Sequence, residues 1–350
     1  MKKVKAEAEE ISRFIHAFLT EYAPTRKTSS GHTLRSYETA LTLFIGFLEE
    51  VKSITSENLS SACFERAMIE EWLDWLERSR GCSPGTCNIR LSSLRVFLRY
   101  LGSRKAQYLY LCNEAAKIES RATVKKHVAG MSREAIKALL GAPSQKTKTG
   151  RRDLTFMVLL YATAARLNEL LDLRVSQLHL KESRPYISLK GKGSKIRTLY
   201  LLPRAVAHIE AYLKEFHGDC PDPDDYLFYS KSKGKSGKLT QPAIDKMLKK
   251  YARAVHESCA DVPLNLHAHI FRHAKATHWF EDGVNLVQIS SLLGHAHLHT
   301  TMEYLDITMA VESEAMATLE DETSAKAPKK WKSGDKSLHS FCGLKALSKR

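Results

Sequence analysis

The sequence predicts a mainly α-helical protein of two domains, with one small β-sheet in the second domain. Three observations support this fold class. Apolar residues recur at helical spacing from Ile11 to Leu101, a polar and basic stretch follows at 119–127, and a glycine-rich hairpin pattern lies beyond it. A chain of 350 residues, with 43% apolar and 27% charged residues, is long enough to form two packed domains.

The N-terminal part is predicted to contain four amphipathic helices. Each has apolar residues three or four positions apart, which places them on one helix face. The turn-forming sequence SRGCSPGT separates the third helix from the fourth. We expect the apolar faces to form the core of a compact domain, whereas the basic residues Arg90, Arg95 and Arg99 suit either a solvated face or phosphate contacts. The predicted helices cover residues 11–22, 34–48, 69–76 and 91–101.

The stretch ESRATVKKH, residues 119–127, is the predicted domain boundary. It is polar and basic, so it offers few apolar side chains that could pack against either neighbour. The first domain is therefore predicted at 1–122 and the second at 127–320. The remaining residues, 321–350, are rich in lysine and are expected to form a basic tail without fixed structure in the free protein.

The second domain is predicted to be helical apart from one β-hairpin. YISLK and KIRTLYL read as two strand segments, joined by a glycine-rich turn. The lysine-rich segment SKSKGKSGK, 230–238, is expected to be a loop that is either solvated or in contact with DNA. The predicted helices are a short one at 132–140, a buried one at 153–173, and two more at 203–216 and 240–255.

Composition restricts the partners and the compartment. A net charge of +15 and a pI near 9.4 favour a polyanionic partner such as DNA, because bound cations release counterions, although RNA or a membrane surface would suit the same charge. No run of about 18 apolar residues occurs, so we expect neither secretion nor membrane insertion. The seven cysteines are scattered without Cys-x-x-Cys pairs, which predicts reduced thiols in a cytoplasmic protein.

Two segments in the second domain carry reactive side chains at informative spacing. His269 and Arg272, in HAHIFRHAKATHWFEDG, are three positions apart on a predicted helix, so both can converge on one anion. Gly294 is a natural helix C-terminus and places His295 at the start of a loop. Tyr304 follows nine residues later on the next predicted short helix.

Two further cations are predicted to join this group. Arg166 is placed at the end of an otherwise apolar helix, where a buried guanidinium needs a carboxylate or a phosphate as partner. That partner is either a bound phosphate or the neighbouring Glu169. Lys192 occupies the predicted tip of the hairpin, from which a long side chain can reach a ligand.

Together these segments resemble the tyrosine recombinases, or phage integrases, in particular their Xer-like and mobile-element branches. That family combines T-G-x-R-x-x-E-L, a G-K-G hairpin, an H-x-x-R-H helix, an L-G-H turn and a tyrosine nine residues beyond. This chain departs from the pattern at Ala164, where glycine is usual, and after Arg272, where it reads HAKATHWFEDG. The resemblance assigns the active site to Arg166, Lys192, His269, Arg272, His295 and Tyr304.

The resemblance implies cleavage and rejoining of DNA without a metal or a nucleotide cofactor. Tyr304 would attack the phosphodiester and form a 3′-phosphotyrosine, with His269 as the base. Lys192 would protonate the leaving 5′ oxygen. Arg166 and Arg272 would hold the non-bridging phosphate oxygens, and His295 would donate a further hydrogen bond to them.

The resemblance also implies an assembly. A helical, SAM-like core-binding domain and a catalytic domain would form a C-shaped clamp around duplex DNA. The protein would be a monomer in solution and a tetramer on two DNA sites, with the segment 306–321 docking onto a neighbouring subunit. Accessory proteins are further candidate partners, and a bacterial, nucleoid-associated location follows.

Three alternatives stay open at this point. A DNA-binding protein with a decayed site would keep the charge and the fold but not the cleavage, and a type IB topoisomerase would use the same chemistry without a specific site. The histidines between His267 and His299 could also hold a transition metal, although carboxylates are sparse there and the arginines would repel a cation. The sequence does not distinguish integration, excision, dimer resolution and transposition, nor does it identify the DNA site.

Overall fold

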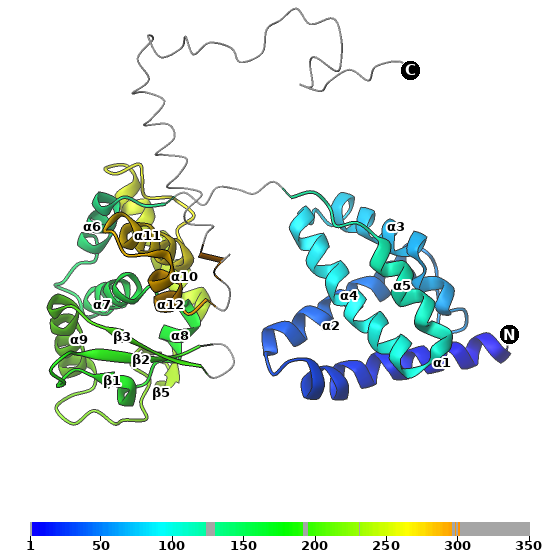
Figure 1. Ribbon diagram of the computed structural model, residues 1–350, viewed down its shortest axis with the longest axis horizontal. Helices are drawn as coiled ribbons and strands as arrows, with labels where there is room; N and C mark the ends of the chain where they lie inside the picture. Colours follow the sequence, from blue (N-terminus) through cyan, green and yellow to red (C-terminus); the bar gives the residue numbers. More distant parts are fainter. Residues whose placement is uncertain are drawn as a thin grey trace, which may run out of the picture. The chain divides into compact units, whose positions relative to one another are not determined.

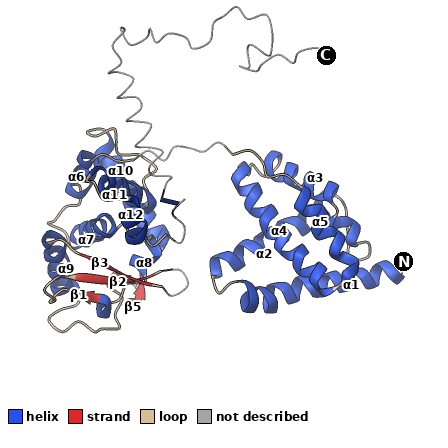
Figure 2. Ribbon diagram, in the orientation of Figure 1, coloured by secondary structure: helices blue, strands red, loops and turns tan. Residues whose placement is uncertain are grey.

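The computed structural model describes residues 2–123, 130–191, 195–230, 232–295, 298 and 300–301. The chain divides into two compact units, Met1–Lys126 and His127–Arg350 (Figure 1). The first unit is entirely helical in its described part, and the second combines helices with two small sheets (Figure 2). The predicted fold class, mainly helical with a small β-sheet, is confirmed.

All four helices predicted in the first unit are present, and a fifth, α5, was not predicted. Ser83 caps the fourth helix, because its hydroxyl accepts a hydrogen bond from the Thr86 amide at 3.3 Å and Pro84 occupies the first turn. The elements are α1 (Lys2–Ala17), the π-helical η1 (Phe18–Lys27), α2 (Gly31–Glu50), η2 (Ser61–Phe64), α3 (Arg66–Arg78), α4 (Pro84–Arg104), η3 (Ala106–Tyr108) and α5 (Leu109–Lys117).

An aromatic core holds the first unit together. Phe44 packs edge-on against Trp72, with ring centroids 5.1 Å apart, and Phe18 packs edge-on against Phe97 at 5.5 Å. All four side chains are fully buried. Their burial confirms that the apolar stripes form the core, and the unit therefore has its own hydrophobic centre.

The end of the first unit is fixed by hydrogen bonds from α4. The Arg95 side chain donates to the carbonyl of Ala115 at 2.8 Å and to that of Ile118, so it satisfies the open C-terminus of α5. Asn88 and Arg121 exchange hydrogen bonds between side chain and backbone at 2.8 and 2.9 Å. The Arg95 guanidinium is therefore engaged by backbone carbonyls of the first unit, a role that the sequence interpretation did not include.

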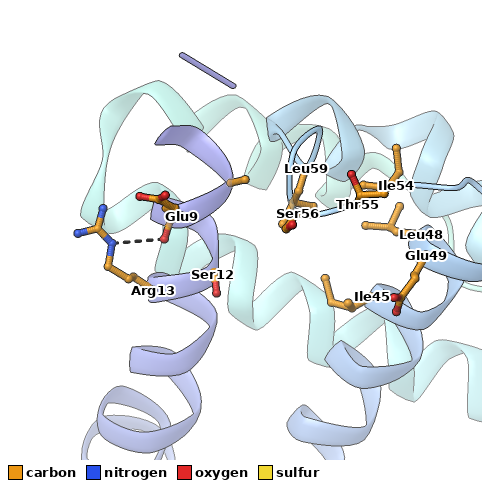
Figure 3. Close-up of a pocket in the computed structure, with 11 residues that line it drawn as sticks. Glu9, Ser12, Arg13, Ile45, Leu48, Glu49, Ile54, Thr55, Ser56 and Leu59 are labelled. Atoms are coloured by element: carbon orange, nitrogen blue, oxygen red, sulfur yellow. Dashed lines mark hydrogen bonds between the residues drawn. The ribbon is translucent and has the colours of Figure 1, made fainter. Parts of the chain in front are cut away.

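A cavity of about 670 Å³ lies in the first unit between α1, α2 and the loop that follows α2 (Figure 3). Its walls are largely apolar, with Leu48 and Ile54 among them, and its charged residues are Glu9, Arg13 and Glu49. Two carboxylates against one guanidinium make it a poor site for a phosphate.

The second unit has the predicted hairpin within a three-stranded antiparallel sheet of order β1-β2-β3. Two short strands, β4 and β5, form a separate antiparallel pair. The elements are α6 (Arg133–Gly141), α7 (Lys148–Thr163), α8 (Leu167–Leu171), η4 (Val175–Gln177), β1 (Leu178–His179), β2 (Tyr186–Lys190), β3 (Ile196–Tyr200), α9 (Pro203–Phe216), β4 (Tyr229–Ser230), β5 (Gly234–Lys238), α10 (Gln241–His256), α11 (Ala268–Glu281) and α12 (Leu286–Leu293).

The register of β2 and β3 turns one cation toward the interior. Ile187 pairs with Leu199, and Leu189 pairs with Arg197, so all four side chains share one face of the sheet. Ile187, Leu189 and Leu199 are buried in the core. Arg197 must therefore find its counter-charge on the inner side of the sheet.

The predicted single helix at 153–173 is wrong, because the chain breaks it into α7 and α8. Ala164 ends α7 in the left-handed conformation, with φ of 48°. The Thr163 hydroxyl then accepts a hydrogen bond from the Ala165 amide at 3.2 Å, and Arg166 becomes the N-cap of α8. Arg166 thus lies at the start of a helix rather than at the end of one.

The prediction of a loop at 230–238 is also wrong for most of that segment. β5 covers Gly234–Lys238, and its Lys238 pairs in register with Tyr229 of β4. The Lys238 ammonium contacts Asp172 at 2.5 Å, and the Lys235 ammonium donates to the His217 carbonyl at 3.1 Å. These lysines are held against the unit by specific partners, which a composition-based prediction does not detect.

Candidate active site

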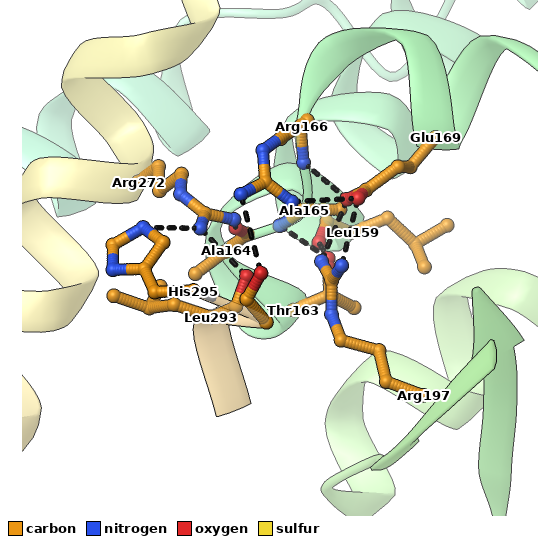
Figure 4. Close-up of polar contacts among 11 residues, drawn as sticks. Leu159, Thr163, Ala164, Ala165, Arg166, Glu169, Arg197, Arg272, Leu293 and His295 are labelled. Atoms are coloured by element: carbon orange, nitrogen blue, oxygen red, sulfur yellow. Dashed lines mark hydrogen bonds and ion pairs between the residues drawn. The ribbon is translucent and has the colours of Figure 1, made fainter. Parts of the chain in front are cut away.

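Four segments that are distant in the sequence meet at one place in the second unit. They are the break between α7 and α8, the inner face of β3, the middle of α11 and the turn that ends α12 (Figure 4). This convergence brings three guanidiniums, one imidazole and one carboxylate together. They belong to Arg166, Glu169, Arg197, Arg272 and His295.

Arg272 is the buried centre of this cluster, with 1% of its surface exposed. Its Nη1 donates to the Ala164 carbonyl at 2.8 Å, and its Nη2 donates to the Leu293 carbonyl at 2.7 Å. Nη2 also lies 2.9 Å from Nε2 of His295. The guanidinium therefore joins the C-terminal ends of α7 and α12, whose last carbonyls carry negative partial charge.

His295 lies directly beside Arg272 and is linked on its other side to Thr301. Its Nδ1 is 2.7 Å from the Thr301 hydroxyl. Burial, followed by the positive charges of Arg272 and Arg166, lowers the pKa of His295 to about 4. In the protein without DNA, the imidazole is therefore neutral at physiological pH.

Arg166 is the most accessible arginine of the cluster, with 40% of its side chain exposed. Its Nη1 donates to Glu169 at 3.1 Å, and its Nη2 lies 3.4 Å from the Gly294 carbonyl. The Glu169 side chain also accepts from the Arg166 amide at 2.7 Å, which caps α8. Of the two partners considered for Arg166, Glu169 is present, and the exposed part of the guanidinium can still meet a phosphate.

Arg197 is a residue of this cluster that the sequence interpretation missed. It holds the buried Glu169 carboxylate with both Nη atoms, at 2.7 and 2.6 Å, in the bidentate geometry of a strong ion pair. Burial favours the neutral acid, but the hydrogen bonds and charge of Arg197, with those of Arg166, lower the pKa of Glu169 below 4.5. The alternation in KIRTLYL places Arg197 on the apolar face of the strand, and this was the available signal.

His269 and His273 lie one turn apart on α11. Their rings meet edge-on, with centroids 4.5 Å apart. His273 is buried, and burial together with the nearby His269 and Arg272 lowers its pKa to about 3. His273 is therefore neutral, and it supports His269 through ring contact.

A groove of about 680 Å³ opens beside Arg166 and His269. Its wall includes Gln241, Asp245 and Lys249 of α10 together with His267, so one carboxylate lies among its cations. An exposed groove with an arginine, a lysine and histidines along it matches the chemistry of a sugar–phosphate backbone. Arg166 and His269 therefore face a surface on which DNA can lie.

Lys192 and Tyr304 lie outside the described residues, as does the predicted C-terminal tail, 321–350. The structure describes the residues that flank them. The Gly191 amide donates to the Lys195 carbonyl at 2.8 Å, so the described residues on either side of 192–194 are hydrogen-bonded to each other. Thr301, the last described residue, precedes Tyr304 by three positions.

The alternative of a metal site gains no support from the part of the chain that the structure describes. No group of three histidine, cysteine, aspartate or glutamate side chains there is arranged to hold a metal ion. Six of the cysteines fall within the same part, and all six are free thiols. None of the helices described is long and apolar enough to cross a membrane.

Comparisons with known proteins agree with this geometry. The phage integrase family model matches residues 130–310, and the N-terminal SAM-like domain model of phage integrases matches residues 15–105. The chain is 30% identical over 302 residues to the tyrosine recombinase XerD of Listeria monocytogenes, covering 85% of this chain and 94% of that protein. It is also 30% identical over 302 residues to XerD of Pseudomonas putida, covering 86% and 93%.

Solved structures share the fold. A XerH site-specific recombinase bound to its difH substrate superposes with a TM-score of 0.63 at 20% identity, covering 85% of this chain and 92% of that one. The integrase of the Tn1549 transposon gives a TM-score of 0.64 at 14% identity, covering 87% and 99%. The chain belongs to the phage integrase family and is a tyrosine-type site-specific recombinase that acts on DNA.

Proposed function

We propose that this recombinase cuts DNA by attack of Tyr304 on a phosphodiester that Arg166 and Arg272 hold beside His269 and His295. The observation that carries the proposal is the convergence of Arg166 and Arg272 on the adjacent carbonyls of Gly294 and Leu293, with His295 hydrogen-bonded to Arg272. The positive charge of this cluster is balanced only in part by one described carboxylate, that of Glu169. The cluster is suited to an anion that arrives from outside.

The arginines would supply most of the rate enhancement. Attack on the phosphorus places extra negative charge on the non-bridging oxygens, and preorganised guanidiniums stabilise that charge at little reorganisation cost. Arg272 is held in place by two carbonyls, and Arg166 by Glu169. Both cations are therefore in position before the DNA binds.

The proton transfers fall to the remaining residues. Tyr304 loses its phenolic proton as it attacks, with His269 as the base, and the bond from phosphorus to the 5′ oxygen breaks. Lys192 gives that oxygen its proton. The products are a 3′-phosphotyrosine and a free 5′ hydroxyl, and attack by a 5′ hydroxyl from a second strand reverses the step without ATP.

The assembly follows from the relatives. The XerH and Tn1549 integrase structures contain bound DNA, and a lambda integrase was solved as a dimer bound to a core site. For this chain we propose a core-binding domain at 1–122, a catalytic domain at 127–320 and a basic tail at 321–350, with the two domains closing around duplex DNA. The protein would be a monomer in the cytoplasm and a tetramer on two sites, with 306–321 docking between subunits.

A nicked suicide substrate tests the nucleophile. Its short cleaved fragment diffuses away, so a covalent adduct accumulates and migrates slowly on a denaturing gel. Tyr304→Phe should abolish the adduct while DNA binding stays unchanged. Tyr200→Phe is the matched control, because Tyr200 is 66% exposed on β3 and should leave the adduct intact.

The other outcomes separate the alternatives. An adduct that persists in Tyr304→Phe would mean that another residue is the nucleophile. No adduct with the unaltered protein on any candidate site would favour a decayed DNA-binding protein. Relaxation of a supercoiled plasmid that lacks the site would favour a topoisomerase activity.

A further inference from the structure

The hydroxyl group of Thr301 is the partner of one ring nitrogen of His295. Thr301 has 0% of its surface exposed, and its Oγ1 lies 2.7 Å from Nδ1 of His295. The other ring nitrogen, Nε2, lies 2.9 Å from Nη2 of Arg272. Both nitrogens of the imidazole are therefore held, one by a hydroxyl and one by a guanidinium.

These two contacts determine where the proton of the ring lies. A guanidinium can only donate hydrogen bonds, so Nε2 must accept and carries no proton. The single proton of the neutral ring then lies on Nδ1. The Thr301 hydroxyl must accept from Nδ1–H, since a hydroxyl can serve as donor or acceptor but a protonated ring nitrogen can only donate.

We propose that Thr301 is a positioning residue of the recombinase, which accepts a hydrogen bond from Nδ1–H and so orients the His295 ring, with Nε2 as the nitrogen directed at the scissile phosphate. The inference rests on the proposed function, in which His295 donates a hydrogen bond to that phosphate. It adds a residue outside the six that the family pattern contains. Thr301 acts through His295 and does not touch the DNA in this account.

The location of the proton decides what His295 can do when DNA arrives. Without DNA, the cations around the ring oppose a second proton, and Nε2 accepts from Arg272. A bound phosphate offsets that positive charge and competes with His295 for the hydrogen bond from Arg272. Nε2 can then take up a proton and donate a hydrogen bond to a phosphate oxygen. Among the described residues, the charged or titratable groups around the ring include Arg166, Arg197, His269, Arg272 and His273.

The hydrogen bond from Nδ1–H of His295 to the Thr301 hydroxyl survives this change. Nδ1 keeps its proton in both the neutral and the charged ring, so the hydroxyl accepts in both states. The ring plane therefore stays fixed while Nε2 changes from acceptor to donor. Because Thr301 precedes Tyr304 by three positions, the same bond ties the segment that leads to the nucleophile to the active site.

Burial of the hydroxyl argues for this role against simple packing. A valine has nearly the shape of threonine and would fill a site with 0% exposure without a hydroxyl to satisfy. A merely structural Thr301 would thus tolerate valine. A Thr301 that positions His295 would not tolerate valine, and only serine, which keeps the hydroxyl, could replace it.

The test compares Thr301→Val, which removes the hydroxyl, with Thr301→Ser, which keeps it. Thr300→Val is the matched control, because Thr300 is the exposed neighbour. In the DNA-free full-length protein, nitrogen NMR of labelled histidine should report a hydrogen-bonded Nδ1–H for His295 in the unaltered protein and in Thr301→Ser, and an upfield shift of that proton signal in Thr301→Val. Circular dichroism verifies that each variant is folded.

The second measurement is the single-turnover rate of adduct formation on the suicide substrate as a function of pH. Thr301→Val should react about tenfold more slowly, the usual effect of losing a partner that orients a ligand-binding histidine, and with an altered pH profile. Thr301→Ser should recover most of the rate, and Thr300→Val should react normally.

Two results would overturn the inference. One is an Nδ1–H proton signal in folded Thr301→Val that is not shifted from its position in the unaltered protein, and the other is an unchanged rate and pH profile in that variant. Failure of the proposed function would give a different result. The unaltered protein would then form no adduct, whereas the NMR difference between Thr301→Val and Thr301→Ser would still be observed. The two ideas can therefore fail separately.

Discussion

Three arginines share the active site, but their surroundings give them different tasks. Arg272 has 1% of its surface exposed, and 13% of the Arg197 side chain is exposed, so both are fixed parts of the protein. Arg166 has 40% of its side chain exposed and can meet a ligand directly. In the proposed function, Arg166 would therefore be the first of the three to contact a phosphate, while Arg197 holds Glu169, the ion-pair partner of Arg166.

The first prediction concerns Arg197. Arg197→Leu removes both hydrogen bonds that hold the buried Glu169 carboxylate, and leaves that charge poorly compensated. We expect the free energy of unfolding to fall by about 3 kcal/mol, the usual cost of breaking a buried ion pair on one side. Urea unfolding measures it. Arg204→Leu, at an exposed position in α9, should change it little, and equal effects of the two variants would contradict the assignment.

The second prediction concerns pH. His273 and His295 have pKa values lowered to about 3 and about 4, whereas an unfolded histidine titrates near 6.5. As the pH falls below about 6.5, the unfolded chain therefore binds more protons than the folded one, and stability declines. Each histidine contributes at most about 1.4 kcal/mol per pH unit.

Unfolding free energies at a series of pH values between about 6.5 and 4.5 test this prediction, because most carboxylates are still charged in that window. His295→Asn should flatten the slope by removing one of the two groups. His16→Asn, at an exposed position of α1, should leave the slope as it is. A stability that rises as the pH falls would be inconsistent with two neutral buried imidazoles.

At the scale of elements, two left-handed residues shape the active site. Ala164 ends α7 with φ of 48°, and Gly294 ends α12 with φ of 65°. Each turn directs a carbonyl to an arginine: that of Ala164 accepts from Arg272, and that of Gly294 lies 3.4 Å from Arg166. The helix ends therefore do more than stop the helices, because they orient the cations.

The third prediction follows from the turn at Gly294. A Cβ at this position would lie 3.1 Å from Nη1 and 3.2 Å from Cδ of Arg197, in a backbone conformation that L-residues avoid. Gly294→Ala should therefore cost about 2 kcal/mol of stability and displace Arg197. Gly46→Ala is the control, since Gly46 is helical with open space around it and alanine there should stabilise by about 0.5–1 kcal/mol. Thermal unfolding of both variants tests these predictions, because the unfolding temperature should fall for Gly294→Ala and rise for Gly46→Ala.

The sequence predicted the elements well where local signals were strong. The L-G-H turn at Gly294 and the hairpin strands around Lys192 were predicted from glycine positions and β-branched residues, and both are present. The break at Ala164 was missed, because alanine favours helices and its left-handed conformation comes from tertiary packing against Ala276 and Leu293.

The residues of the candidate site also divide into those that local sequence signals predict and those that depend on tertiary contacts. His269, Arg272 and His295 could be selected by spacing and motif, since one helix face and one turn place them. Arg197 and Thr301 could not, because their roles depend on which side chains face them across the fold. Partners that orient other residues carry weak sequence signals, and only coordinates bring them together.

At the scale of the whole molecule, two separate cores support the chain. The first unit buries its own aromatic cluster, and the second buries a larger set of residues around α7, α11 and the sheet. Each unit is large enough to fold alone. In the proposed function, a net charge of +15 would let both units contribute cations to DNA binding.

The fourth prediction tests this independence in the full-length chain. Leu94→Ala removes a fully buried side chain from the first core, and Leu160→Ala does the same in the second, each at a cost of about 2–5 kcal/mol. Trp72 reports on the first unit through its fluorescence, because it is fully buried there. Leu94→Ala should lower the urea midpoint seen by Trp72, whereas Leu160→Ala should leave that midpoint unchanged and lower the midpoint of the second unit. If both variants shift one common transition by similar amounts, the two units unfold as a single cooperative body and their cores are not independent.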